Sequence, residues 1–162
     1  MMYHLRRLEK AITERETMLA IIHAEKYLTL ALCRDNEPYL VTMNYGFDAA
    51  ANCFYLHCAD EGKKIDYWRS QPVVWGQILD DHGYVAGACD HAYRTVQFKG
   101  RVTFVEATAE KRRALSLMID QLEPDPTSVK TRLLSPERLA NVTIVRIDIQ
   151  SLSGKENVPP TT

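Results

Sequence analysis

The residues best suited to chemistry lie between Phe54 and Trp68, where the sequence reads FYLHCADEGKKIDYW. An apolar strand is expected to end at His57, and Gly62-Lys63-Lys64 then opens a helix. Two lysines in the first turn of a helix lie against the positive end of its dipole, which is unfavourable unless an anion is bound there. Backbone N–H groups at the helix start, with Asp60 as the expected N-cap, would add donors. The segment therefore indicates a phosphate site, and a solvated turn is the alternative.

A second group of reactive side chains follows, in Asp80-Asp81-His82 and Cys89-Asp90-His91. Imidazole, carboxylate and thiol groups can all bind a metal ion, although their spacing here matches no standard zinc motif. A metal site and a solvated loop are both open for this segment. The four cysteines show no CxxC spacing and are expected to be reduced core thiols: Cys33, Cys53, Cys58 and Cys89.

Composition narrows the class of protein. The chain has 162 residues, of which 46% are hydrophobic and 25% charged, as expected for one globular domain. A formal net charge of −1 lacks the excess positive charge that is typical of proteins that bind nucleic acid. The opening MMYHLRRLEK lacks the apolar core of a signal peptide, and no apolar run is long enough to span a bilayer. We therefore expect a cytoplasmic protein with neither nucleic acid nor membrane as a partner.

Alternation and helical periodicity predict a mainly β protein with flanking helices. Apolar and polar residues alternate from Val96 to Val105, the clearest half-buried strand. A capping box of Thr13 and Glu16 opens the first helix, and apolar residues at helical spacing mark another from Thr108 to Leu122. The expected helices cover 13–24, 63–70, 108–122 and 135–140, and the expected strands cover 27–33, 39–47, 53–58, 73–79, 96–105 and 142–150, with a long connection over 80–92.

Six or seven mostly antiparallel strands with helices between them favour a closed or nearly closed β-barrel of α+β type. One domain is expected over 1–155, followed by a flexible C-terminal tail over 156–162. In the strand over 39–47, Thr42 and Asn44 share a face because side chains alternate along a strand. These two polar groups need hydrogen-bond partners and are candidates for a binding surface.

Five segments together resemble the FMN-binding split β-barrel family. Within that family, the chain resembles the Nim-type nitroimidazole-resistance proteins related to pyridoxamine 5'-phosphate oxidase. The resemblance implies a homodimer with two FMN sites at the subunit interface. The segments that carry it are LRRLEKAIT, PYLVTMNYGF, FYLHCADEGKKIDY, CDHAYRTVQFKGRVTFVE and IDIQSLSGK.

The resemblance also implies roles for individual residues. Lys63 and Lys64 correspond to the phosphate ligands of the family. The strand segment Thr42, Met43, Asn44 and Tyr45 corresponds to the strand that contacts the flavin ring and ribityl chain, partly through its main chain. Tyr93, Arg94 and Thr95 correspond to the segment by which the second subunit reaches the cofactor. His57 matches the histidine that Nim-type proteins carry beside the flavin, which makes it the candidate catalytic residue.

The function implied is FMN-dependent reduction of small oxidised substrates such as nitroimidazoles or other nitroaromatics. Oxidation of pyridoxamine phosphate is not expected, because the oxidase pattern of arginine and lysine on the second strand is absent. Some split-barrel relatives bind haem, for which His57, His82 or His91 would be the axial ligand. Three alternatives stay open: a flavin- or haem-binding protein without turnover, a cofactor-free dimeric barrel, and a purely structural role for His57.

Overall fold

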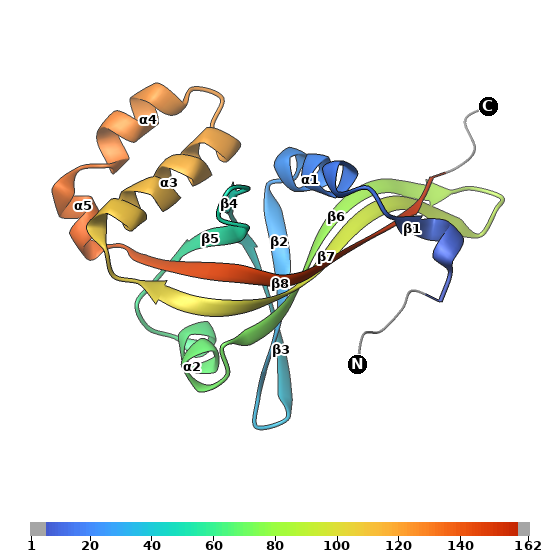
Figure 1. Ribbon diagram of the computed structural model, residues 1–162, viewed down its shortest axis with the longest axis horizontal. Helices are drawn as coiled ribbons and strands as arrows, with labels where there is room; N and C mark the ends of the chain where they lie inside the picture. Colours follow the sequence, from blue (N-terminus) through green and yellow to red (C-terminus); the bar gives the residue numbers. More distant parts are fainter. Residues whose placement is uncertain (1–5, 159–162) are drawn as a thin grey trace.

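One antiparallel sheet organises the protein (Figure 1). The computed structural model describes residues 6–158, in which the strands follow the order β3-β2-β6-β7-β8-β5-β4 and the short β1 pairs with β8. The elements are η1 (Leu8–Lys10), β1 (Ala11–Ile12), α1 (Arg15–Ala24), β2 (Tyr27–Arg34), β3 (Glu37–Asn44), β4 (Gly46–Asp48), β5 (Cys53–Cys58), α2 (Lys63–Ser70), β6 (Val73–Val85), β7 (Asp90–Val105), α3 (Thr108–Leu122), α4 (Pro126–Leu133), α5 (Pro136–Asn141) and β8 (Thr143–Asn157).

The inward sides of the strands fill the curved sheet with a single aromatic and aliphatic core. Phe54 of β5 and Phe98 of β7 lie at its centre, with ring centroids 4.6 Å apart. Gly76 of β6 lies directly under Phe98, and a Cβ at this position would fall 2.1 Å from the ring. The glycine is therefore required by the close approach of the aromatic ring rather than by a turn.

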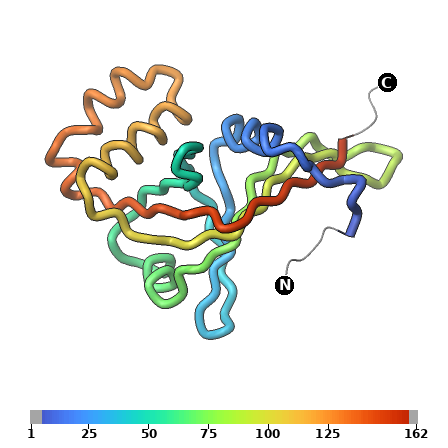
Figure 2. The backbone as a smooth tube through the Cα atoms, in the orientation of Figure 1, coloured from blue at the N-terminus to red at the C-terminus, as the bar shows by residue number. Residues whose placement is uncertain are grey.

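Helices cover separate parts of the outer surface (Figures 1 and 2). α3, α4 and α5 form a layer beside β4 and β5, and a second apolar cluster joins Tyr55 of β5 and Ile144 of β8 to Ala114 of α3. α2 lies on the other side of the sheet, near the start of β6. Between residues 6 and 158, no helix is both long and apolar enough to cross a membrane.

The predicted mainly β architecture is confirmed, with α2 and α3 at the predicted bounds. The first helix begins at Arg15, with Glu14 as N-cap and no side-chain hydrogen bond at the cap, so the predicted capping box is not formed. α4, β1 and β4 were not predicted, because their segments are short and lack a clear period.

Two segments expected to be irregular are strand. Most of 80–92 extends the β6–β7 hairpin, which accommodates Gly83 at φ +86 as an irregularity in the register. The expected tail was also placed too early, because β8 continues to Asn157, opposite Tyr93 of β7. Residues 159–162 of that tail lie outside the described residues. Both strands are polar here because they extend past the core, which removes the apolar alternation that marks a strand in sequence.

Candidate functional site

The sheet leaves two backbone edges unpaired close to α2. Among residues 6–158, β3 pairs only with β2, and β5 pairs with β4 only over Cys53–Tyr55, so the end of β5 from Leu56 to Cys58 has one free side there. Four residues separate the end of β5 from the start of α2, and Lys63 in the first turn of α2 contacts Glu37 and Tyr39 of β3. Unpaired N–H and C=O groups are therefore available on both sides of the start of α2.

The first turn of α2 is itself uncapped. Gly62 is the N-cap, at φ +117 and ψ 172, and no side chain of the described part of the chain accepts from the helix start, so the predicted cap by Asp60 is wrong. The Ile65 and Asp66 N–H groups both donate to the Gly62 carbonyl, which leaves the earlier amides of the turn without an intrahelical acceptor. A Cβ at Gly62 would meet nothing within 4 Å, so there is open space beside these amides.

The two predicted phosphate lysines point to different surroundings. Lys63 Nζ lies 3.0 Å from Glu37 Oε1 and 4.8 Å from the centroid of the Tyr39 ring. The hydrogen bond from Lys63 lowers the pKa of the Glu37 carboxyl. Lys64 is half-buried and has no ion pair within residues 6–158. Burial raises the pKa of the Cys58 thiol, and the charge of Lys64 opposes that rise. Lys64 is thus the lysine left available for an anion.

β3 presents alternating faces, as predicted. Thr42 and Asn44 are exposed on the outer face, where Thr42 Oγ1 lies 2.9 Å from Thr29 Oγ1 and Asn44 Nδ2 donates to the Lys26 carbonyl at 2.9 Å. Met43 packs against the core, and the fully buried Tyr45 donates its hydroxyl to the Ile22 carbonyl. Only main-chain atoms of Met43 and Tyr45 are therefore open to a ligand on the outer face.

Large apolar side chains flank the polar centre of this outer face. Thr29 of β2 pairs with Thr42 of β3 on one side and with Gln77 of β6 on the other, which places three polar residues in one row. Four large apolar residues lie on either side of that row. Their exposed fractions are 52% for Tyr27, 67% for Leu40, 50% for Trp75 and 39% for Leu79. We name these four residues and the three of the row the outer sheet face. Alternation alone does not say which face of a strand is covered, so the exposure of Trp75 becomes evident only in the structure.

The predicted segment Tyr93, Arg94 and Thr95 lies elsewhere on the same sheet. Arg94 binds Asp80 at 2.7 Å, and Thr95 is buried with its hydroxyl donating to the Ile78 carbonyl. Arg101 pairs with the start of β6, next to α2, whereas Arg94 is seven residues further along β7. At about 3.3 Å per residue this separation is roughly 23 Å. Within one chain, these residues therefore lie well along the sheet from the start of β6, the strand that follows α2.

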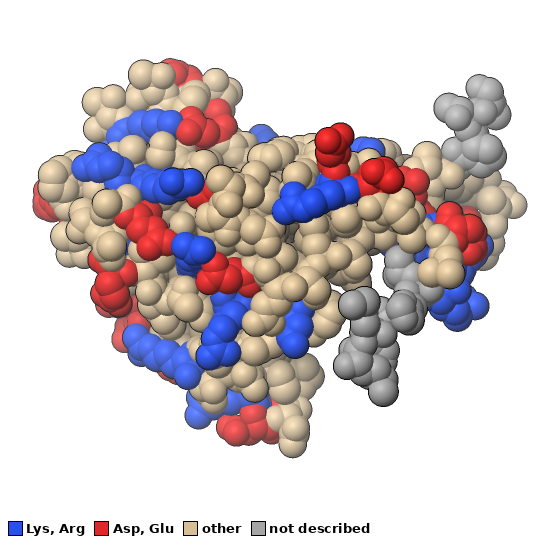
Figure 3. Space-filling model, viewed as in Figure 1, with Lys and Arg blue, Asp and Glu red and all other residues tan. Residues whose placement is uncertain are grey.

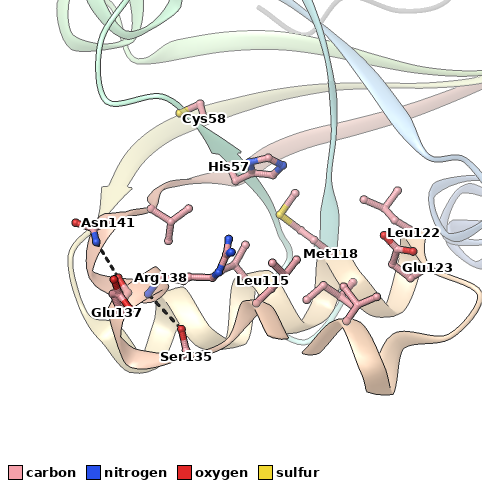
Figure 4. A pocket seen from close by; sticks show the side chains of 14 residues that line it. His57, Cys58, Leu115, Met118, Leu122, Glu123, Ser135, Glu137, Arg138 and Asn141 are labelled. Atoms are coloured by element: carbon pink, nitrogen blue, oxygen red, sulfur yellow. Dashed lines mark hydrogen bonds between the residues drawn. The ribbon is translucent and has the colours of Figure 1, made fainter. Parts of the chain in front are cut away.

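His57 lies at the end of β5 and is exposed to a cavity of about 620 Å³ beneath α3, α4 and α5 (Figure 4). Its side chain shares the face of Tyr55, which packs toward α3, so it points out of the main core on a different strand from those of the outer sheet face. The apolar lining comes mainly from two of the helices: Leu115, Met118, Ile119 and Leu122 of α3 and Val129 and Leu133 of α4.

The histidines of the β6–β7 hairpin are paired with carboxylates. His82 Nε2 lies 3.0 Å from Asp80 Oδ2, and His91 Nε2 lies 2.6 Å from Asp81 Oδ1. Although burial acts to raise the pKa of Asp80, hydrogen bonds from Arg94 and His82 hold it below its usual value. No group of three or more potential metal ligands is brought together among residues 6–158. Cys33 and Cys89 are exposed, in contrast to their expected place in the core.

Comparison with known proteins identifies the family. The sequence matches the model of the pyridoxamine 5'-phosphate oxidase family over residues 14–156. The chain belongs to this family. An uncharacterised protein of Rhizobium meliloti (strain 1021) is 31% identical over 98 residues, which cover 60% of this chain and 58% of that protein. The match therefore spans little more than half of the length of that relative.

Solved structures confirm the split-barrel fold of this oxidase-family chain. A proposed 5-nitroimidazole antibiotic resistance protein of Bacteroides thetaiotaomicron superposes with a TM-score of 0.76 at 24% identity, covering 96% of this chain and 95% of its own. An FAD- and haem-binding protein of Mycobacterium smegmatis superposes with a TM-score of 0.77 at 17% identity, covering 94% of this chain and 77% of its own. Proteins that share the fold thus include binders of flavin and of haem.

Proposed function

We propose that the protein binds FMN at the start of α2 and acts as a reductase of small oxidised substrates such as nitroimidazoles or other nitroaromatics. The observation that carries the proposal is the uncapped first turn of α2, with Lys64 unpaired within residues 6–158 beside it. Free amides at a helix start together with an ammonium group form a phosphate site. Family membership and the flavin-binding relatives named above support FMN as the ligand.

The residues around α2 fit the two ends of FMN. The phosphate would be held by the Lys64 ammonium and the amides of the first turn, with open space at Gly62. The flavin ring would lie against the free edges of β3 and β5, whose backbone groups are suited to a heterocycle that both donates and accepts hydrogen bonds. When bound, the flavin supplies the hydride or electron transfer, and the protein supplies binding and orientation.

We also propose that the protein is a homodimer that buries the outer sheet face. Tyr27, Leu40, Trp75 and Leu79 expose large apolar surfaces on adjacent strands, which is unusual for a surface that stays in water. Arg94 lies roughly 23 Å along β7 from Arg101, which pairs with the start of β6 just after α2, so we infer that the segment around Arg94 approaches a flavin from a second copy. The implied contribution of Tyr93, Arg94 and Thr95 therefore depends on the dimer.

Replacing Trp75 by glutamate is expected to raise the dissociation constant of the dimer about tenfold. Buried aromatic residues dominate protein interfaces, and the substitution would put an unpaired charge where the indole ring was. Sedimentation equilibrium over a range of concentrations measures the change. Tyr84→Glu is the matched control, because Tyr84 is 65% exposed on the hairpin of β6 and outside the outer sheet face. A dimer unaffected by Trp75→Glu would place the interface on another surface.

His57 is proposed to donate a hydrogen bond or proton to the substrate. It is exposed in the cavity at the free end of β5, next to Cys58, whose surroundings include the charge of Lys64. An imidazole near neutral pH can act as donor in either protonation state. The cavity beneath α3 would then hold the substrate on the side of β5 that faces the helices.

Replacing His57 by alanine is expected to leave FMN affinity unchanged and to slow substrate reduction about tenfold, the size of one lost hydrogen bond. Protein loaded with FMN and reduced by dithionite can be mixed with a nitroimidazole, with flavin reoxidation followed in a single turnover. His23→Ala is the control, since His23 is an exposed histidine of α1 outside the cavity lining. Equal rates for His57→Ala and wild type would make His57 a structural residue.

The absorption spectrum of the purified protein tests the proposal most directly. FMN produces an absorption band at about 450 nm, and haem produces a Soret band at shorter wavelength. A colourless protein that takes up no added FMN in a fluorescence titration would overturn the flavin proposal. A Soret band in its place would favour the haem alternative, in which an exposed histidine such as His57 is the ligand.

A further inference from the structure

The cavity beneath α3, α4 and α5 has properties that the flavin site does not require. At about 620 Å³ it lies within the usual range for small-molecule pockets, and apolar residues make up more than half of its lining. Its polar groups come from separate elements: His57 from β5, Glu123 after α3, and Ser135, Glu137, Arg138 and Asn141 around α5. A molecule bound here would be mainly apolar, with its orientation fixed by a small number of polar contacts.

Arg138 is the polar group placed to fix such a molecule. Its side chain extends from α5 into the middle of the cavity, toward Leu115 and His57 (Figure 4). α5 is held in position by the fully buried Leu139 and by the Arg138 N–H, which donates to Ser135 Oγ at 3.4 Å. The guanidinium is therefore presented by an anchored helix rather than by a free loop.

The guanidinium has no carboxylate partner within residues 6–158, whereas Arg94, Arg113 and Arg146 each form ion pairs. Glu137 and Glu123 also line the cavity, but in Figure 4 they lie toward opposite sides of it, with the Arg138 guanidinium between them. A planar guanidinium matches a carboxylate or sulfonate through paired hydrogen bonds. Charge complementarity thus favours an anionic group at the centre of the cavity.

We propose that this cavity binds a small organic anion with an apolar body, whose acidic group pairs with Arg138 while the body packs between α3 and α4. Binding does not depend on flavin, because Arg138 and most of the apolar lining come from the helices. If the flavin proposal also holds, an anion in this cavity would lie against His57, which makes Arg138 a determinant of which oxidised substrates are accepted.

Two fluorescent probes of similar apolar shape test the proposal on flavin-free protein: anilinonaphthalene sulfonate, which is anionic, and phenylnaphthylamine, which is neutral. Arg138→Gln is expected to weaken binding of the sulfonate about tenfold and to leave the neutral probe unchanged. Arg132→Gln is the matched control, because Arg132 is an exposed residue of α4 outside the cavity lining. Val129→Trp is expected to fill the cavity and weaken the binding of both probes.

The outcomes separate the parts of the proposal. An unchanged affinity ratio of the two probes in Arg138→Gln would overturn the role of Arg138, and unchanged binding of both in Val129→Trp would overturn the cavity as the site. In the wild-type protein, added salt should weaken binding of the sulfonate probe and leave binding of the neutral probe unchanged. FMN titration of the same variants is a separate readout, so loss of FMN binding would bear on the flavin site and not on this cavity.

Discussion

Lys64→Ala is expected to weaken FMN binding by about 1.5–3 kcal/mol, which corresponds to roughly a 10- to 150-fold higher Kd. The reason is that Lys64 supplies the one ammonium group beside the uncapped first turn of α2 that has no ion pair within the described chain. A charge-assisted hydrogen bond to phosphate is among the stronger polar contacts. Quenching of flavin fluorescence on titration measures the affinity.

Lys63→Ala is the matched control for this experiment. The ammonium of Lys63 already binds Glu37 and lies over the Tyr39 ring, so its removal takes away a surface ion pair instead of a phosphate ligand. An exposed pair of this kind contributes little, and we expect less than about a threefold change in FMN affinity. Equal losses in the two variants would mean that Lys63 leaves Glu37 when FMN binds, and an unchanged Kd for Lys64→Ala would remove Lys64 from the site.

Phe98→Ala is expected to lower the free energy of unfolding by about 3–5 kcal/mol, the largest effect of any substitution considered. The Phe98 ring is fully buried, packs on Phe54 and fills the space above Gly76. Its loss would leave a cavity in the middle of the sheet that rigid strands cannot close. Urea denaturation followed by circular dichroism gives the change, provided that the slope of the transition is unaltered.

Two further variants control that measurement. Phe98→Leu keeps most of the apolar volume and is expected to lose only about 1–1.5 kcal/mol, which remains measurable if the alanine variant does not fold. Tyr84→Ala removes an aromatic ring that is 65% exposed and is expected to change stability by less than about 0.5 kcal/mol. A loss below about 1 kcal/mol for Phe98→Ala would place the ring outside the cooperative core.

The sequence predicted those elements whose apolar pattern is set by a single buried face. The strand from Val96 to Val105 and the helix from Thr108 to Leu122 each bury one side, so their period is visible in the residues. The outward placement of Thr42 and Asn44 followed from the same alternation. Lys64 at the start of α2 was found because residue type and helix position together indicate an anion.

Features that depend on contacts between distant parts of the chain could not be predicted from local sequence patterns. The pairing of Lys63 with Glu37 joins two elements that are far apart in sequence, and nothing near Lys63 indicates it. Arg138 belongs to a short helix whose place over β5 is decided by the burial of Leu139. The exposure of Trp75 depends on which face of β6 the other elements leave uncovered. Alternation predicts a strand, but the packing around it decides which residues meet a ligand.

The free edge of β3 connects the proposed flavin site with protection against aggregation. An unpaired edge strand is a template on which another chain can add a strand, and proteins usually blunt such edges with proline or charge. β3 has Glu37 and Pro38 at its beginning only, and the rest of the strand carries apolar and small polar residues. Whatever occupies the edge, whether a ligand or a second subunit, also shields it from unspecific pairing. Selection for binding at this edge is therefore also selection against aggregation.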